Sequence, residues 1–256
     1  MSKGFVLVYV FIFLISLVTF SNLLVKAESV SIIINPNGSI TGTNRIQQIG
    51  NTYTFTANIS GNIQVQKSNV VIDGKDYTLD CNNNSGIDLT NGIGQNPTRP
   101  TISNVTIENL YIESGGIGTN GGGNDTFYND YIPSIQFLGD CTNNNITFCT
   151  VIAISYDYGG NATVTENNLT GNILVWLSFG GIADRNYWSD YLTKYPNATE
   201  IGNSGVGNQP YVYATVQNYT QTIYCQDNHP LLKPVAIPIM RLCEKSNLFR
   251  EIASYM

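Results

Sequence analysis

A short phrase that recurs along the chain, from about residue 62 to residue 179, limits what this sequence can fold into. The phrase is an Asn followed by an apolar, a variable and a second apolar residue. Its copies are Asn69-Val-Val-Ile72, Asn104-Val-Thr-Ile107, Asn145-Ile-Thr-Phe148 and, less regularly, Asn161-Ala-Thr-Val-Thr165. Alternation with a period of two is typical of a short strand with one buried face. Strands this short cannot bury that face alone, so they must stack on one another.

Strands stacked about 4.8 Å apart, with turns between them, form a parallel β-helix, so the repeat predicts an all-β solenoid. The Asn of each phrase suits a turn, because Asn tolerates a left-handed backbone and can pair with the Asn of the next coil. An ordinary β-sandwich is the alternative. The alternation also predicts a set of side chains that point into the solenoid: Val70, Ile72, Val105, Ile107, Ile146 and Phe148.

The distances between copies of the phrase predict about five coils. Asn69 and Asn104 are 35 residues apart, and Asn104 and Asn145 are 41 apart. Both distances exceed one coil of roughly two dozen residues, so we expect two inserted loops. They are expected at Thr90 to Pro100 and at Gly115 to Asp125. The second is nearly all Gly and Asn, so we expect it to be mobile.

The N-terminal segment, residues 1–27, has the features of an export signal. Lys3 precedes an apolar run from Phe5 to Phe20, and Val25-Lys-Ala27 offers small residues for cleavage. A cleaved signal peptide is expected, with a retained membrane anchor as the alternative. Either one makes the chain secreted or cell-surface, and membrane contact is expected only through a retained segment. The formal charge of −6 argues against a nucleic-acid partner.

On an exported chain, Asn-X-Ser/Thr sequons are candidate glycan acceptors. There are ten, at Asn37, Asn58, Asn83, Asn104, Asn124, Asn145, Asn161, Asn168, Asn197 and Asn218. A chain with 32 Asn also produces sequons by chance. Those inside the repeated phrase are expected to be turn residues first. Asn124 and Asn197, on expected loops, are the better candidates.

After Phe179 the phrase stops and an aromatic-rich segment begins. Its pieces are Asn186-Tyr-Trp-Ser-Asp-Tyr191, Tyr195-Pro-Asn-Ala-Thr-Glu-Ile201, Gly205-Val-Gly-Asn-Gln-Pro-Tyr-Val212 and Asp227-Asn-His-Pro-Leu-Leu-Lys-Pro234. This resembles the terminal module of NosD-like right-handed parallel β-helix proteins, an exported family common in archaea. Val70-Val-Ile72, Asp73-Gly74 and Tyr77-Thr-Leu79 resemble its first full coil. The resemblance implies a right-handed parallel β-helix and little about activity, because most members have no established one.

The repeat and the resemblance together divide the chain. The expected parts are a signal peptide or anchor (1–27), a lead-in segment (28–52), the parallel β-helix (53–182), a C-terminal cap (183–235) and a tail without an assigned role (236–256).

Four aromatic residues, Tyr187, Trp188, Tyr191 and Tyr195, fall within nine positions of the expected cap. Buried rings would plug the open end of the solenoid, whereas exposed rings would stack on sugars. These residues are therefore also the candidate ligand site. Their position directly after the last coil favours the cap and predicts a buried Trp188, because bare strand edges invite aggregation.

The resemblance suggests a calcium site or a copper site, and the sequence gives little support to either. Where relatives show an Asp-rich glycine loop suited to calcium, this chain has Gly202-Asn203 and Gly207-Asn208, which leaves Asp190 and Glu200 as candidate ligands. Some relatives are named for copper and for nitrous oxide reductase maturation. His229 is the only His of the chain, so copper rests on the family name alone. No cofactor is therefore expected.

Five cysteines, which include Cys141 and Cys149, lie beyond the export segment. In an oxidising compartment these two are the expected disulfide, because the loop between them is short.

Many β-helices act on polysaccharides, so an enzyme must be weighed. A hydrolase needs two carboxylates at a set separation. The adjacent Asp pair and the Arg-X-Lys in which β-helix polygalacturonases resemble one another do not occur here. Lys75 beside Asp73 and Asp76 is the one group suited to a lyase, and Asp73-Gly74 reads more simply as a turn.

We therefore expect a non-enzymatic surface or extracellular protein whose partners are polysaccharides or cell-surface glycans that it binds or displays. A carbohydrate-active lyase or hydrolase is the first alternative. A NosD-like copper accessory protein is the second.

Overall fold

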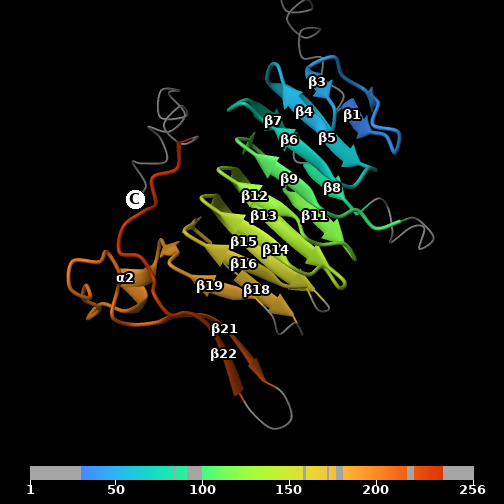
Figure 1. Cartoon of the computed structure of the whole chain (residues 1–256). Coiled ribbons are helices and arrows are strands. Elements are labelled where there is room, and N and C mark those ends of the chain that lie inside the picture. The colour runs from blue at the N-terminus through green and yellow to red at the C-terminus, as the bar shows by residue number, and fades with distance from the viewer. Residues whose placement is uncertain are drawn as a thin grey trace, which may run out of the picture.

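The computed structural model describes residues 30–82, 85–90, 100–157, 160–171, 173–176, 181–217 and 222–238. Two long sheets face each other and form the walls of a parallel β-helix (Figure 1). The predicted export segment and the tail beyond residue 238 lie outside the described residues. Within the described ranges, no helix has the length and apolar character needed to cross a membrane.

Sheet A has twelve strands within the described residues. They are β1 (Val30–Ile34), β2 (Ile40–Thr41), β5 (Ile59–Val65), β7 (Thr78–Asp80), β8 (Ile87–Leu89), β10 (Tyr111–Ile112), β11 (Ile117–Asn120), β13 (Tyr131–Leu138), β15 (Thr150–Asp157), β17 (Asn168–Leu169), β18 (Ile173–Trp176) and β20 (Tyr187–Trp188). Apart from the β1–β2 pair, the strands of this sheet run parallel.

Sheet B has ten strands in the same ranges. They are β3 (Ile46–Ile49), β4 (Thr52–Phe55), β6 (Val70–Asp73), β9 (Val105–Glu108), β12 (Thr126–Tyr128), β14 (Asn144–Thr147), β16 (Ala162–Thr165), β19 (Ile182–Asp184), β21 (Tyr211–Gln217) and β22 (Thr222–Asp227). From β4 to β19 every neighbour is parallel. Antiparallel hairpins, β3–β4 and β21–β22, lie at the two ends of the stack. The all-β, parallel β-helix fold that the repeat predicts is confirmed.

The coils contain fewer residues than the sequence analysis predicted. Register neighbours Thr106, Thr126 and Asn145 are 20 and 19 residues apart, and the next two steps of sheet B are 18 and 19. The longer step from β6 to β9 is 35 residues and contains 91–99, the core of one expected loop, which lies outside the described residues. The stretch from Asn104 to Asn145 is therefore two coils without an insertion. Seven parallel strands stack from β4 to β19 in the described ranges, one for each coil. The prediction of about five coils was therefore too low.

The segment Gly115 to Asp125, expected to be a mobile loop, is part of the solenoid wall. Its centre is β11, which pairs with β8 on one side and β13 on the other, and Ile117 and Thr119 point into the core. Gly123 approaches the next coil so closely that a Cβ there would lie 2.1 Å from the carbonyl oxygen of Thr142. The expectation was wrong because it took glycine as a sign of mobility, whereas here glycine permits close packing of coils.

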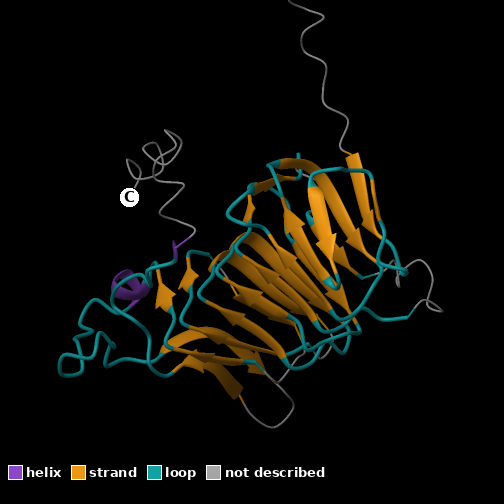
Figure 2. Cartoon of the chain, turned by 45° about the horizontal axis from the view of Figure 1, so that its top comes forward, coloured by secondary structure: helices purple, strands orange, loops and turns teal. Residues whose placement is uncertain are grey.

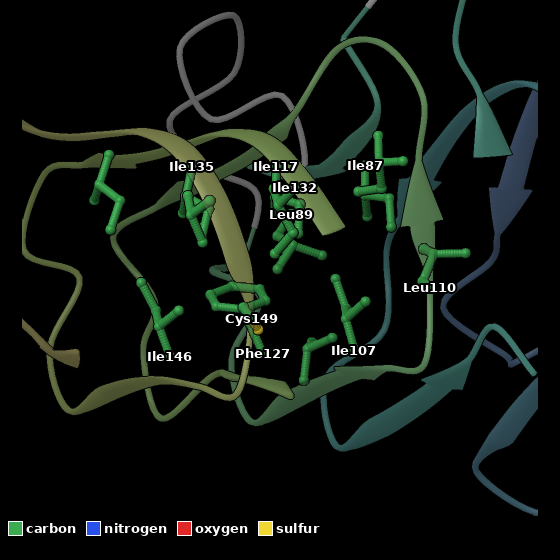
Figure 3. Close-up of a cluster of buried hydrophobic side chains, with 14 of the residues drawn as sticks. Ile87, Leu89, Ile107, Leu110, Ile117, Phe127, Ile132, Ile135, Ile146 and Cys149 are labelled. Carbon is green, nitrogen blue, oxygen red and sulfur yellow. The ribbon is translucent and has the colours of Figure 1, made fainter. Parts of the chain in front are cut away.

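Side chains from both sheets fill the interior in stacked columns, as Figure 3 shows for the central coils. One column consists of isoleucines that are buried and in register along sheet A: Ile63, Ile87, Ile117, Ile135, Ile154 and Ile173. Burial of each such side chain stabilises the fold by about 1.5–3 kcal/mol. Of the six predicted inward residues, all but Phe148 are buried. Phe148 instead lies at a corner with φ 54°, and its ring packs edge-on against Tyr128.

From β9 onward, each coil turns from sheet B to sheet A at one residue with a left-handed backbone, and the loops run along these corners (Figure 2). At two successive corners this residue is Asn, and Asn129 Nδ2 donates to Asn109 Oδ1 at 2.7 Å. At the opposite corner, Asn104 Nδ2 donates to Asn69 Oδ1 at 2.8 Å. The predicted pairing of Asn between coils is thus confirmed.

Candidate functional site: a glycine-floored groove on sheet A

The predicted aromatic motif closes the C-terminal end of the solenoid. Trp188 in β20 is 2% exposed, and its ring stacks on Tyr211 and Tyr213 with centroid distances of 4.1 and 5.5 Å. Tyr191, in the short helix α2 (Tyr191–Lys194), is 1% exposed. The prediction of a buried Trp188 is confirmed. Neither Trp188 nor Tyr191 presents a ring face to a sugar, so these two residues are not a stacking platform.

The other two aromatic residues of the motif are half-buried and take part in the same cap. The Tyr195 hydroxyl accepts the backbone N–H of Val212 at 3.2 Å, and its ring contacts that of Tyr191. Tyr187 pairs through its backbone with Asn168 of the preceding coil. The motif as a whole therefore packs the end of the solenoid.

A buried carboxylate, Asp227, joins the cap hairpin to the last coil. Its oxygens accept hydrogen bonds from the backbone N–H groups of Arg185, Asn186 and His229, from the Asn186 side-chain amide and from the Trp188 indole. Five N–H donors replace the water that a buried carboxylate loses. The sequence placed Asp227 in the family-like ending without assigning it a role.

The two carboxylates considered for calcium serve separate local contacts. Asp190 Oδ1 accepts the Tyr211 hydroxyl at 2.8 Å, and Glu200 Oε1 accepts the backbone N–H of Gly205 at 2.7 Å. In the part of the chain that the structure describes, no three His, Cys, Asp or Glu side chains are grouped as metal ligands would be.

The predicted disulfide between Cys141 and Cys149 is not formed, and both thiols are free and buried. The two cysteines flank β14, and an extended strand of four residues spans about 13 Å. A disulfide needs Cα atoms within about 4.4–6.8 Å. The Cys141 sulfur instead accepts the Thr119 hydroxyl at 3.0 Å, and burial raises the pKa of Cys149 well above its ordinary value.

Among the sequons, the favoured Asn124 and Asn197 are both exposed. Asn168 is different, because it is 8% exposed and both ends of its amide are bonded. Asn168 Nδ2 donates to the Val235 carbonyl at 3.0 Å, and Asn168 Oδ1 accepts the Val235 N–H at 2.7 Å. Exposure therefore permits modification at the first two sites and burial opposes it at Asn168.

The site that the structure adds lies on the outer face of sheet A. A groove of about 500 Å³, here termed the β11 groove, runs over β8, β11 and β13. The residues that line it include Asp88, Thr90, Gly116, Gly118, Ser134 and Gln136. Its volume falls in the range of about 300–1,000 Å³ that is typical of ligand sites.

Glycine in β11 forms the floor of this groove. Ile117 and Thr119 point into the core, so Gly118 between them faces outward. Asp88 of β8 and Gln136 of β13 are its register neighbours, and their side chains form the two walls. The floor follows one strand, so the groove runs along β11 and across the solenoid axis.

The two floor glycines, Gly116 and Gly118, differ in whether the fold leaves room for a side chain. A Cβ on Gly116 would lie 2.4 Å from the backbone carbonyl oxygen of Ser134, so the fold itself requires glycine there. Among the described residues, a Cβ on Gly118 would meet only the Thr90 methyl group, at 3.8 Å, which is an ordinary contact. Packing therefore admits a side chain at position 118, and the effect of glycine there is to keep the groove open.

The groove has a mixed polar and apolar lining and carries negative charge. Of its described lining residues, Asp88 is the one ionisable side chain, and it accepts the backbone N–H of Thr90 at 2.7 Å. Asp80 and Glu113 follow the paired residues Leu79 and Ile112, which point inward, and so lie on the same outer face. No Lys or Arg belongs to the described lining.

An aromatic pair lies on the same face. Tyr111 of β10 and Tyr131 of β13 are register neighbours, and their rings stack with centroids 4.5 Å apart and planes 12° from parallel. Tyr111 precedes the glycine floor in the same coil.

A second group of ionisable side chains lies on sheet B, where Asp73 and Glu108 are register neighbours. Burial alone would raise the pKa of Asp73, but hydrogen bonds from Lys75 and Asn109 outweigh it and hold the pKa below its ordinary value. Burial and the charge of Asp73 raise the pKa of Glu108. Opposite pKa shifts in neighbouring carboxyl groups are typical of acid–base sites and also of structural ion-pair networks.

Searches among protein-family models, curated proteins and solved structures find no match to this chain. The fold and the geometry of the groove therefore carry the functional argument.

Sequence reasoning missed the β11 groove because it assigned this segment to a loop. The available signal was the alternation Gly116-Ile117-Gly118-Thr119, in which small and inward-pointing residues follow each other as in a strand.

Proposed function

We propose that this is an exported, non-enzymatic β-helix protein that binds glycans in the β11 groove. The observation that carries the proposal is Gly118, which leaves the groove open where packing would admit a side chain. Ser134, Gln136 and Asp88 supply hydroxyl, amide and carboxylate groups around it, and such groups hydrogen-bond to sugar hydroxyls. Aromatic rings also stack on sugars, and the Tyr111–Tyr131 pair on the same face supports the proposal.

The variant Gly118→Val tests the proposal directly. Valine fits a strand and fills the groove, so we expect glycan-array binding to be lost while the melting temperature is retained. Thr165→Val, a change on the outer face of sheet B that leaves every sequon intact, is the matched control and should bind as the wild type does. Unchanged binding by a folded Gly118→Val variant would show that the groove is not the site.

Export is part of the proposal and rests on the apolar segment within residues 1–27. Mass determination of the mature N-terminus, together with cell fractionation, tests it. An intact chain found in the cytoplasm would contradict it.

A second candidate function, a carbohydrate-active lyase or hydrolase, is favoured by Asp73 and Glu108. Their backbones are one coil apart, about 4.8 Å, and retaining glycosidases hold two carboxyl groups about 5–5.5 Å apart. Incubation with a polysaccharide panel, with and without calcium, tests this candidate. If the wild type and the Glu108→Gln variant release equal amounts of product, Asp73 and Glu108 are not the catalytic pair.

The resemblance to NosD-like proteins, and the copper accessory role that it implies, stay predictions. Metal analysis of the purified protein tests that role.

A further inference from the structure

We infer that the β11 groove takes an uncharged oligosaccharide segment of about two to three sugar residues, which lies along β11 and across the solenoid axis. The inference rests on the proposed glycan binding and adds the orientation, length and charge class of the ligand.

The orientation follows from the floor and the walls. Gly116 and Gly118 belong to the same coil, whereas Asp88 and Gln136 stand on the coils to either side. These two neighbouring strands are about 10 Å apart, two coil spacings. A polysaccharide parallel to the solenoid axis would have to pass over both walls. A chain that follows β11 meets bare backbone instead and has wall side chains along both edges.

The length follows from the extent of the wall on β13. The lining residues of this strand run from Ser134 to Leu138, whose register neighbour on β11 is Asn120. Four steps along an extended strand cover about 13 Å, which accommodates between two and three pyranose residues in an extended chain. A groove of about 500 Å³ agrees with a ligand of that size.

The charge class follows from the ionisable groups of this face. Asp88 stands in the wall, Asp80 and Glu113 lie on the same face, and the described lining contains no cation. The whole chain carries a formal charge of −6. A uronate residue would bring its carboxylate toward these groups without a counter-charge, and like charges within a few ångströms repel. Neutral hydroxyl groups find donors and acceptors in Ser134 and Gln136.

Calorimetric titration with oligosaccharides of two to six residues tests the inference, with neutral gluco-, manno-, xylo- and chito-series compared with oligogalacturonates. We expect affinity for a neutral series to rise to about three residues and then level off, with oligogalacturonates bound about tenfold more weakly. Equal affinity for oligogalacturonates would overturn the charge class. Affinity that still rises at six residues would overturn the orientation. Absence of binding to every oligosaccharide would overturn the proposed function itself.

A matched pair at Gln136, an exposed wall residue, isolates charge from shape. Gln136→Lys should raise the affinity for oligogalacturonates about tenfold, and Gln136→Glu should lower it further, while melting temperatures stay equal. If the two variants change oligogalacturonate binding in the same direction, charge does not decide which ligand is accepted.

Discussion

The indole N–H of Trp188 donates a hydrogen bond to Oδ2 of Asp227 at 3.1 Å, and both side chains are buried. Because 39 positions separate the two residues, this bond joins the last strand of sheet A to the hairpin beyond it. The same carboxylate accepts the backbone N–H groups of Arg185 and Asn186, which have no further coil above them in the part of the chain that the structure describes. In a continuing solenoid, the next coil would accept the hydrogen bonds of these N–H groups. Here the Asp227 side chain of the cap accepts them instead.

Removal of this carboxylate should loosen the cap. Asp227→Ala leaves buried N–H donors unpaired, and we expect a loss of about 3–5 kcal/mol in the free energy of unfolding, measured with urea. Asp190→Ala is the control, because it removes one hydrogen bond at an exposed residue and should cost about 1 kcal/mol. Equal losses in the two variants would contradict the role assigned to Asp227.

The buried Asp125 should make stability depend on pH. Its Oδ1 accepts the Val105 N–H, but Oδ2 has no hydrogen-bond partner among the described residues. Burial raises the pKa of Asp125 from 3.8 to about 7. The folded state therefore favours the protonated acid. The resulting stability is fully present below the unfolded pKa and is lost as the pH rises toward 7.

Asp125→Asn carries no proton to lose, so it should be more stable than the wild type at pH 8 by roughly 3 kcal/mol and similar to it at pH 4. Buried Asp130 has a pKa raised in the same direction and keeps part of the pH dependence in both proteins. Melting temperatures between pH 4 and pH 9 check this prediction. Parallel curves for the two proteins would show that Asp125 does not titrate in this range.

The two floor glycines should respond oppositely to the same substitution. Gly116→Ala forces a Cβ against the Ser134 backbone and should destabilise the fold by about 1–3 kcal/mol. Gly118→Ala makes only an ordinary contact with the Thr90 methyl group among the described residues and should stabilise the fold by about 0.5–1 kcal/mol, because alanine loses less backbone entropy in a strand. Chemical denaturation measures both. A stable Gly116→Ala variant would mean that these coils are not so closely packed.

Glycan occupancy should follow exposure. In a host that modifies exported chains at sequons, we expect glycans at Asn197 and Asn124 and none at Asn168, whose amide is bonded to Val235. Glycopeptide mass spectrometry measures occupancy site by site. An occupied Asn168 in folded, secreted protein would show that the Val235 segment does not pack there.

The sequence alone determined the parallel β-helix and most of its inward residues. Val105 and Ile107 could be assigned to the core because alternation within one strand is a local property, which needs no knowledge of the neighbouring coil. The pairing of Asn69 with Asn104 was predictable for a similar reason, since Asn tolerates the left-handed backbone of a corner.

Where each coil turns was decided by the stack. Phe148 continues the alternation of its strand, yet the coil turns at this residue, because the corners of neighbouring coils must align for the strands to pair. The same alignment places Cys141 and Cys149 at opposite ends of β14 and keeps their thiols apart.

The candidate groove depended entirely on tertiary structure. A run of glycines has no local preference for strand or loop, so pairing with β8 and β13 on both sides decided that Gly115 to Asn120 would be a wall. Only that pairing sets Asp88 and Gln136, 48 residues apart in the chain, on either side of Gly118. A strand's own residues fix which way its side chains point, whereas the site needs three strands in register, which is a long-range property.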